Sequence, residues 1–342
     1  MLPPIDPEWA AAHSVHYGFL ANQQNMLEDA QRTGSYRTGI TANRSDFSGR
    51  TVLDVGAGTG ILSIFAAQAG ARKVYAVEGT HMAEHARRLI EGIGLADRIE
   101  IVRGSLSEIS LANKVDIVIS EPWGFFLFHE RMVEAFLLAR DRFLAPGGKL
   151  FPSTARLWLA PFIDQPLHDS RTHAAAFWQQ SDFFGVDLST MADVAALELF
   201  AMPVLGPVNP QDLMASPAVY PFDFTKMSLG DLAEIRLPFE FVATHFGPIH
   251  GIAGWFDVAF EGTDRRVVLS TAPDQPRTHW SQLRFLFAEP PVVHVGDRMR
   301  GSLLLKANRQ SSYDVVFEGE VEGAARLPPQ TFYIHTYLNW GN

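Results

Sequence analysis

Cysteine is absent from the 342 residues of this chain. The absence excludes a disulfide framework and a zinc site built on thiolates, and we expect no bound metal. No apolar run approaches the ~18 residues that a membrane-spanning helix needs. Residues 1–9 hold three prolines in place of the basic and apolar stretches of a secretory signal. These absences predict an intracellular protein that does not enter a membrane.

Basic charge is also scarce, with 28 Lys and Arg against 38 Asp and Glu and a formal net charge of −10. A nucleic-acid-binding protein needs a basic face for phosphate, so we expect no direct binding to nucleic acid. An acidic surface attracts cationic partners such as basic peptides, although the same charge also simply keeps a protein soluble. Apolar residues make up 47% and charged residues 19%, which predicts a globular chain of one large or two smaller domains.

Short aliphatic runs alternate with helical patterns in the first part of the chain. The runs predict buried strands at 51–55, 73–77, 99–102 and 115–120, and the segments among them predict helices at 61–69, 82–93 and 130–143. This alternation predicts a parallel sheet with helices on both faces. The sequence Ala145-Pro146-Gly147-Gly148 is expected to stop the last helix.

Beyond residue 151 the pattern changes to short runs divided by Gly, Pro and Asp, which predicts a β-barrel or sandwich. The expected strands are 251–260, 266–271, 282–287, 301–306 and 313–320. Residues 168–199 are rich in alanine and aromatics and predict a helical insert, and residues 17–32 predict a helix ahead of the sheet. We therefore expect three parts: a helical segment at 1–50, an α/β domain at 51–152 and a β domain at 153–342.

A glycine-rich loop, VLDVGAGTG (52–60), follows the first predicted strand. Its glycines let the backbone pass close to a nucleotide-like ligand, and Glu78 at the end of the second predicted strand is placed to bind ribose hydroxyls. The spacing is G-x-G-x-G, which is shorter than the loop that binds a pyrophosphate and disfavours a nicotinamide dehydrogenase. With Asp54 two residues ahead, the loop favours S-adenosylmethionine, which has no phosphate.

Two glutamates, Glu121 and Glu130, flank a loop that is otherwise almost wholly apolar. Glu121 ends a predicted strand at the sheet edge where open α/β sheets bind ligands. Glu130 alone is also explained as a helix-opening residue that interacts with the helix dipole. Two carboxylates in an apolar loop are costly unless a cation lies between them, and a guanidinium matches their geometry. His279 is a third candidate, although a lone histidine on a β-rich segment is more often structural.

These residues together resemble the type I protein arginine methyltransferases, and among them the coactivator-associated branch. The resemblance runs from Tyr17 to about Val315. Its motifs are 23–26, 32–34, 52–60, 66–73, 121–130, 177–178, 185–188, 255–260, 270–273 and 278–280. Pro122 and the sequence Glu130-Arg131-Met132 favour the coactivator-associated branch.

The resemblance implies a Rossmann-like domain that binds S-adenosylmethionine, followed by a β-barrel domain in which the insert at about 168–199 is a dimerisation arm. The implied reaction methylates arginine in proteins or peptides, histones among them, giving mono- and asymmetric dimethylarginine and S-adenosylhomocysteine. It also implies a homodimer in the nucleus or cytoplasm. The family's extra N-terminal domain and long tail have no counterpart in this sequence, so the resemblance is to the catalytic core alone.

Residue roles follow from the same resemblance. Segment 1–50 would cover the cofactor. The implied catalytic residues are Glu121 and Glu130, which would grip the guanidinium, and His279, which would pair with Asp29. The implied cofactor-binding residues are Tyr17, Gln23, Met26, Arg32 (for the cofactor's carboxylate), Asp54, Gly56, Gly58, Gly60, Glu78 (for the ribose) and Ser107. The implied substrate pocket comprises Met26, Trp123, Met132, His279 and Trp280.

Several positions depart from the family pattern. The usual Tyr-Phe pair is His13-Ser14, Ser107 replaces an acidic residue at the adenine, and Trp123 and Phe125 replace Met and Tyr. Trp123 is therefore expected to add bulk near the substrate, and Glu108 or water would hold the adenine. A small-molecule methyltransferase and a catalytically weak binding module remain the alternatives.

Overall fold

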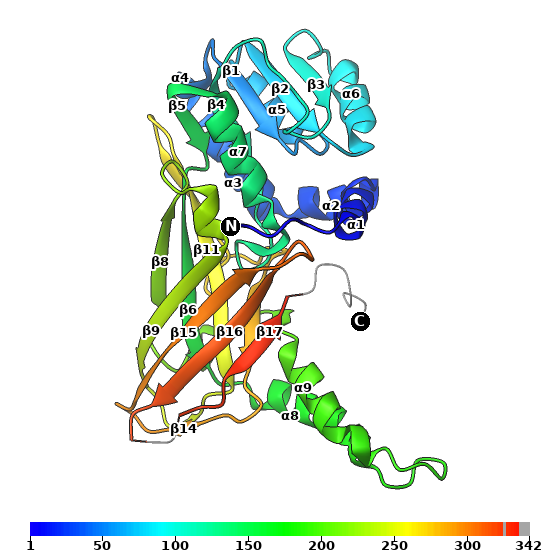
Figure 1. Cartoon of the computed structure of the whole chain (residues 1–342). Coiled ribbons are helices and arrows are strands. Elements are labelled where there is room, and N and C mark those ends of the chain that lie inside the picture. Colours follow the sequence, from blue (N-terminus) through cyan, green and yellow to red (C-terminus); the bar gives the residue numbers. More distant parts are fainter. Residues whose placement is uncertain (324–325, 335–342) are drawn as a thin grey trace.

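The computed structural model describes residues 1–323 and 326–334, so the expected end of the β domain at 335–342 lies outside the described residues. Figure 1 shows a parallel sheet with its helices at one end of the molecule and a long β domain at the other. The N-terminal helices lie between these two parts, and a helical arm projects from the far end of the β domain.

The N-terminal part consists of four helices. They are α1 (Pro7–Tyr17), α2 (Leu20–Glu28), α3 (Ala30–Thr41) and α4 (Arg44–Phe47). The helical segment expected at 17–32 is divided between α2 and α3, because the chain leaves the helical conformation at Phe19 and at Asp29. The Asp29 carboxylate accepts a hydrogen bond from the Arg32 N–H and so caps α3.

Helix α3 packs closely against the β domain at Gly39. A Cβ added at this glycine would lie 2.6 Å from the Phe260 ring, so no larger residue fits without a shift. The Phe260 ring also makes an edge contact with Tyr36, with centroids 4.8 Å apart. These contacts fix the N-terminal helices on the β domain.

The first sheet has five parallel strands in the order β3-β2-β1-β4-β5. The strands are β1 (Thr51–Val55), β2 (Lys73–Glu78), β3 (Ile99–Arg103), β4 (Val115–Ser120) and β5 (Leu144–Phe151), and the helices among them are α5 (Ile61–Gln68), α6 (Met82–Gly92) and α7 (Val133–Phe143). The aliphatic strands are buried on both faces, as parallel sheets require. The chain reverses its direction of winding at β1 and β4, and such a switch point is where α/β sheets bind ligands.

The expected start of the last helix beside this sheet is wrong. Helix α7 begins at Val133, because Glu130 and Arg131 have positive φ angles of 71° and 58°. The helix ends at Phe143, just before the Ala145-Pro146-Gly147-Gly148 sequence, as expected. That sequence then forms a bulge inside β5, since β4 pairs first with Leu144 and next with Lys149.

The β domain contains two larger sheets that pack face to face. The strands are β6 (Thr154–Phe162), β7 (Val204–Gly206), β8 (Ala218–Asp223), β9 (Glu234–Val242), β10 (Gly247–Pro248), β11 (Gly251–Glu261), β12 (Arg266–Ser270), β13 (Gln282–Leu286), β14 (Val292–Val293), β15 (Arg298–Ala307), β16 (Tyr313–Val321) and β17 (Gln330–Tyr333). One sheet has the order β7-β13-β11-β6-β8 with β12 beside β11, and the other has the order β17-β16-β15-β9. Their inner faces share one core, for example where Phe285 contacts Phe332. The expected fold class, a Rossmann-like domain followed by a barrel with a helical insert, is confirmed.

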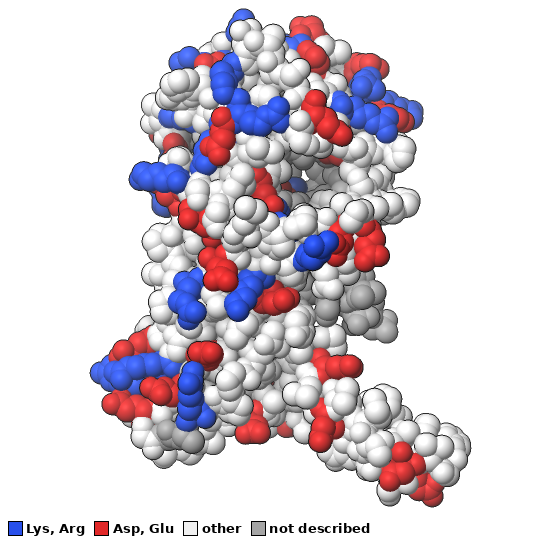
Figure 2. Space-filling view, viewed as in Figure 1, with Lys and Arg blue, Asp and Glu red and all other residues white. Residues whose placement is uncertain are grey.

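The helical arm leaves the barrel after β6. It comprises α8 (Gln165–Ala176), two short 3-10 turns (Phe177–Gln179 and Ser189–Met191) and α9 (Ala192–Ala201). Its outer part carries large exposed apolar side chains, among them Phe184 at 93% and Leu197 at 73% exposure. Charged side chains are few on the face of the arm that Figure 2 shows, and they are acidic. Among the described residues, no helix is long and apolar enough to cross a membrane.

Candidate active site

The glycine loop lies at the carboxyl end of β1 and adopts a backbone that favours glycine. Gly56, Gly58 and Gly60 have φ angles of 68°, 54° and 80°. A Cβ at Gly56 would meet nothing within 4 Å, whereas a Cβ at Gly58 would lie 2.6 Å from the Gln23 amide oxygen of α2. Gln23 in turn donates to the Tyr17 carbonyl at 3.0 Å. Helix α2 therefore covers the loop, and open space remains above Gly56.

Glu78 closes the loop from the end of β2. Its side chain is buried, and its two oxygens accept the N–H groups of Gly58 and Thr80, each at 2.8 Å. An ionised carboxylate offers about four acceptor positions. Glu78 can therefore hold the loop and still accept hydroxyl groups from a ligand.

Asp54 lies beneath the loop and not on its ligand side. Its carboxyl is wholly buried and accepts the Ser63 hydroxyl at 2.6 Å. Burial raises its pKa to about 7 against the effect of Ser63. The expectation of direct contact with a cofactor needs correction, because this carboxyl supports the loop from the core.

Arg32 is paired with Glu121 across the switch point. Its Nε and Nη2 atoms donate to one oxygen of Glu121, Oε2, at 2.8 and 2.5 Å, and its Nη1 atom donates to the Met26 carbonyl at 3.2 Å. Burial, the largest single effect, acts to lower the pKa of this guanidinium, but the charge and hydrogen bonds of Glu121, with smaller contributions from Tyr36 and Asp29, together raise it. Arg32, a residue expected at the cofactor's carboxylate, thus also orients Glu121.

The second glutamate, Glu130, is buried beside α1. Its Oε2 atom accepts the Tyr17 hydroxyl at 2.8 Å and lies 3.6 Å from Nδ1 of His13. Burial raises the pKa of Glu130 to about 7, against the Tyr17 hydrogen bond and with a further contribution from the charge of Glu121. Tyr17 therefore donates to Glu130 through its hydroxyl and accepts from Gln23 through its carbonyl.

The loop that joins the two glutamates has a strained backbone. Phe126, Leu127, Glu130 and Arg131 all have positive φ angles between 55° and 71°. Each such residue other than glycine costs about 1–3 kcal/mol and persists only where its surroundings hold it. Such strain often accompanies functional sites, and here it surrounds a buried carboxyl.

His279 and Asp29 meet as the resemblance implied. Asp29 Oδ2 accepts both the backbone N–H of His279 at 2.8 Å and its ring Nδ1 at 2.7 Å. Burial acts to raise the pKa of Asp29, but the hydrogen bonds from His279 and Arg32 hold it below its ordinary value. The pair borders a cavity of about 580 Å³ between α2 and the loop after β12. Its lining is Asn25, Glu28, Asp29, Ala30, Gln31, Pro276, Arg277, Thr278 and His279.

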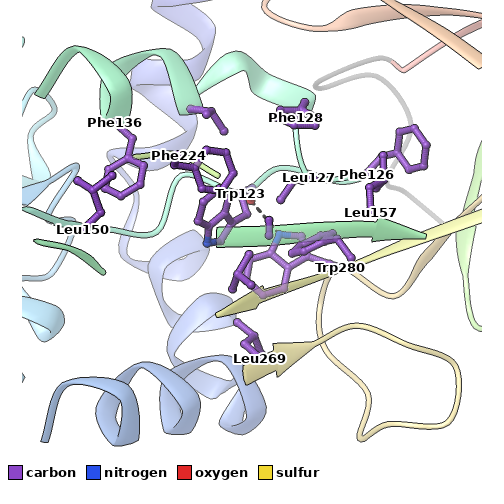
Figure 3. Close-up of a cluster of buried hydrophobic side chains, with 14 of the residues drawn as sticks. Trp123, Phe126, Leu127, Phe128, Phe136, Leu150, Leu157, Phe224, Leu269 and Trp280 are labelled. Atoms are coloured by element: carbon purple, nitrogen blue, oxygen red, sulfur yellow. Dashed lines mark hydrogen bonds between the residues drawn. The ribbon is translucent and has the colours of Figure 1, made fainter. Parts of the chain in front are cut away.

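Two tryptophans that were expected in the substrate pocket lie in the core (Figure 3). Trp123 is 2% exposed, packs against Phe136 and Phe224, and donates its indole N–H to the Tyr36 hydroxyl at 2.8 Å. Trp280 is 3% exposed and donates to the Trp123 carbonyl at 2.9 Å. The expected extra bulk at the substrate needs correction, since both rings support the loop from behind.

The other expected residues lie at the edges of the site. Met26 is half-buried, with its sulfur 4.0 Å from the Arg32 Nη2 atom that binds Glu121. Met132 is half-buried directly after the strained pair that includes Glu130. Ser107 is exposed after β3, and its hydroxyl lies 2.8 Å from that of Ser105.

The structure adds three residues to the site that were not among the expected site residues. Tyr36 is wholly buried and donates to the Ser120 carbonyl at 2.9 Å, so it joins the end of β4 to Trp123. His13, a departure from the family pattern, lies with Nδ1 3.6 Å from the Glu130 carboxylate. The Ser311 hydroxyl donates to the Glu130 carbonyl at 3.0 Å from 181 residues away, a separation that no local pattern reveals.

Comparison with known proteins first identifies the class. Residues 52–148 match the family described as "Methyltransferase domain". Residues 153–323 match the family described as "Arginine methyltransferase oligomerization subdomain". The chain is thus a methyltransferase domain followed by an oligomerization subdomain.

Solved structures then identify the family. Protein arginine methyltransferase 10 of Arabidopsis thaliana is 35% identical, with 93% of this chain and 99% of that chain covered and a TM-score of 0.85. PRMT1 of Trypanosoma brucei, in an enzyme–prozyme complex with AdoHcy, is 32% identical over the same shares and has a TM-score of 0.84. The chain belongs to the protein arginine methyltransferases.

Curated relatives agree with the resemblance to the coactivator-associated branch. The probable histone-arginine methyltransferase CARM1 of Oryza sativa subsp. indica is 48% identical over 312 residues, which are 91% of this chain and 59% of that protein. The histone-arginine methyltransferase CARMER of Drosophila ananassae is 44% identical over 314 residues, which are 92% of this chain and 59% of that protein. The chain spans about three fifths of the length of these relatives.

Proposed function

We propose that this protein transfers methyl groups from S-adenosylmethionine to arginine side chains of other proteins, with histones as one substrate class, and that it gives mono- and asymmetric dimethylarginine. The observation that carries the proposal is the pair of buried glutamates, Glu121 and Glu130, at the ends of one strained loop. Family membership supports the reaction class, and the relatives' names support histone substrates.

The residues at the switch point fit the cofactor. Gly56 leaves open space where a nucleoside would approach the backbone, and Glu78 keeps acceptor positions for ribose hydroxyls. Arg32 has five N–H donors, so it can hold Glu121 and also bind the cofactor's carboxylate. The Trypanosoma brucei relative was solved with AdoHcy, the demethylated product. When bound, S-adenosylmethionine supplies a methyl group on a positively charged sulfur.

The two glutamates would bind the substrate guanidinium from two sides. Arg32 holds Glu121 through Oε2, so Oε1, which accepts the longer 3.3 Å bond from the Trp123 N–H, faces the substrate. Glu130 presents a carboxyl whose ionised form a cation stabilises. Ionised carboxylates polarise the guanidinium toward one terminal nitrogen and align it, and such alignment supplies several kcal/mol of a barrier.

The methylated guanidinium must then lose a proton. Glu130, with its pKa near 7, is a better acceptor at neutral pH than an ordinary carboxylate. His279 is the second acceptor, because Asp29 holds Nδ1 and leaves Nε2 for the proton. Both groups therefore belong to the proposed catalytic set, together with Glu121 and Asp29.

Asymmetric dimethylation needs room beside one nitrogen and a wall at the other. Met26 supports this outcome, because its sulfur lies beside the Arg32 atom that binds Glu121. Methionine side chains are slim and adaptable, and Met132 would act in the same way beside Glu130. We propose a homodimer as the active form, since residues 153–323 match an oligomerization subdomain and the arm exposes apolar side chains.

The test is an assay with labelled S-adenosylmethionine and mixed arginine-containing peptides, followed by mass spectrometry of the dimethylarginine isomers. Wild-type protein should yield the asymmetric isomer through a monomethyl intermediate. Glu130→Gln should lose about 10²-fold or more of the rate, the usual scale for removing an acid–base group. Glu84→Gln, at an exposed glutamate of α6, should keep the wild-type rate. A Glu130→Gln variant with more than about a tenth of the wild-type rate would contradict the clamp.

A further inference from the structure

Glu130 and Arg131 form a left-handed pair, two successive residues with left-handed backbone conformations that are unfavourable for side chains with a Cβ. Their φ angles of 71° and 58° lie in a region that residues with a Cβ rarely adopt. Neither residue is glycine, so contacts from outside the loop must hold the backbone. The structure shows these contacts on both residues of the pair.

The Arg131 side chain joins three separate parts of the protein. It is 2% exposed and forms a two-bond pair with Glu134 of α7, at 2.5 and 3.1 Å. Its Nη1 atom donates to the Asn308 carbonyl at 2.6 Å, and its Nη2 atom donates to the Pro3 carbonyl at 2.9 Å. These bonds use the planar donor fork of arginine, which lysine lacks. None of these bonds goes to the Glu130 carboxyl, so Arg131 does not act here as its counter-ion.

The turn between β15 and β16, residues 308–312, holds the other half of the pair. Ser311 has a φ angle of 57° and donates its hydroxyl to the Glu130 carbonyl at 3.0 Å. The Asn308 side chain fixes this turn by accepting the N–H groups of Gln310 and Ser312, each at 3.0 Å. One turn of the barrel therefore holds the carbonyl of Glu130 and the guanidinium of Arg131.

The same turn also anchors the chain that leads into α1. The Asp6 N–H donates to the Arg309 carbonyl at 2.9 Å, and the Asp6 carboxylate pairs with the Arg309 guanidinium at 2.5 Å. Helix α1 begins at the next residue and carries Tyr17, which donates to the Glu130 carboxyl. The turn thus sets the position of the carboxyl and of its hydroxyl partner.

We propose that Arg131 and Ser311 are positioning residues, which lock the left-handed pair and so keep the Glu130 carboxyl buried and aimed at α1. The inference depends on the proposed function only for the claim that Glu130 binds substrate. The held geometry itself is a property of the folded chain.

The groups that face the Glu130 carboxyl determine how its ionisation would change if the contacts of Arg131 and Ser311 were lost. Tyr17 and His13 face it from α1, His129 faces it from its own loop with Nδ1 4.0 Å away, and the charge of Glu121 acts from the end of β4. Arg131 acts on this environment through the backbone. If the pair relaxes, the carboxyl moves toward water and its ionised form becomes easier to make.

The experiment compares Arg131→Ala with Arg140→Ala. Arg140 lies on α7 and also donates to two carbonyls of the β domain, those of Phe224 and Met227, but its bonds lie away from Glu130. Protein labelled at glutamate side-chain carboxyl carbons is titrated by NMR, and the Glu130 signal is identified by its loss in Glu130→Gln. Arg131→Ala should move the Glu130 titration from near pH 7 toward the ordinary value of about 4.3. Arg140→Ala should leave it in place.

Kinetics give the second readout. Arg131→Ala should lower kcat by about 10²-fold, the scale for a misplacement of ~1 Å, with little change in cofactor affinity. Arg131→Lys should rescue little, because lysine cannot form the two-bond pair. Ser311→Ala, which removes one donor, should shift the titration in the same direction by a smaller amount, and it carries the test if Arg131→Ala fails to fold.

An unshifted Glu130 titration in a folded Arg131→Ala or in Ser311→Ala would overturn the inference, as would equal losses of rate in Arg131→Ala and Arg140→Ala. Because the titration needs no turnover, it decides the inference even if wild-type protein methylates no arginine peptide. That last result would overturn the proposed function alone.

Discussion

The Tyr17 hydroxyl donates a 2.8 Å hydrogen bond to the Glu130 carboxyl across 113 residues of sequence. Beside it stands His13, in place of the family's usual tyrosine, with Nδ1 3.6 Å from the same oxygen. Burial and the neighbouring His16 lower the pKa of His13 to about 4, so this ring is neutral at physiological pH. The Glu130 carboxyl thus accepts a hydrogen bond from a neutral hydroxyl and lies beside a neutral imidazole, and a cation would stabilise its ionised form.

The first prediction concerns pH. Below about pH 7 Glu130 is protonated and no longer attracts a guanidinium, so kcat/KM should rise with pH through about 7. The Tyr17 bond lowers the pKa of Glu130, so Tyr17→Phe should move this rise to higher pH. Tyr220→Phe, which removes a hydroxyl bonded to the distant Pro238 carbonyl, should not move it. The measurement is kcat/KM as a function of pH. An unchanged profile in Tyr17→Phe would contradict the assignment of this rise to the ionisation of Glu130.

Cofactor binding should depend on both ends of the switch-point site. Arg32→Ala and Glu78→Ala should each weaken S-adenosylmethionine binding about 10-fold or more, since a hydrogen bond to a charged group contributes about 1.5–3 kcal/mol. Arg32→Ala should also lower kcat because it releases Glu121. Isothermal titration calorimetry measures the affinities, and unchanged affinity in both variants would contradict the proposed cofactor site.

Trp123 should matter for stability and not for substrate choice. Replacing it by methionine, the residue usual in the family, removes two ring contacts and the bond to Tyr36. We expect a loss of about 2–4 kcal/mol in the free energy of unfolding, below the full cost of Trp→Ala. Urea denaturation checks this, with peptide preference measured beside it. A loss of less than about 1 kcal/mol in the free energy of unfolding would contradict the core position of Trp123 and favour a place in the substrate pocket.

The arm should mediate self-association. Wild-type protein should sediment as a dimer at micromolar concentration, and Phe184→Asp should sediment as a monomer with reduced activity. The phenylalanine is 93% exposed, so the change costs the folded monomer little. Val295→Asp is the control, at a 68% exposed valine of the β domain outside the arm. A fully active wild-type monomer would refute the proposal.

Predicting strands from the sequence worked where a strand is a plain aliphatic run. It failed at β5, whose bulge of Pro and Gly looks like a helix stop, and at β9, where charged residues and Pro238 alternate with buried ones. The start of α7 was missed because nothing local marks Glu130 as left-handed. Local patterns describe a residue and its near neighbours, and these features depend on partners elsewhere.

The site shows the same division. Glu78 and Glu121 were found because strand ends at a switch point are a general rule. The pairing of Arg32 with Glu121, 89 residues apart, and of Tyr36 with Trp123, 87 apart, depends on the tertiary fold. Sequence alone therefore named the clamp residues but missed the contacts that hold them.

The fit of Gly39 under Phe260 has a consequence for the order of events during synthesis. The N-terminal helices are made before the β domain, and Asp29 is made 250 residues before His279. At about 5–20 residues per second, α3 spends roughly 10–50 s without its partner strand. Until Phe260 has been made, Gly39 and Tyr36 of α3 lack the ring that packs against them. The site is therefore completed only when the β domain has been made, well after the residues of α2 and α3 that belong to it.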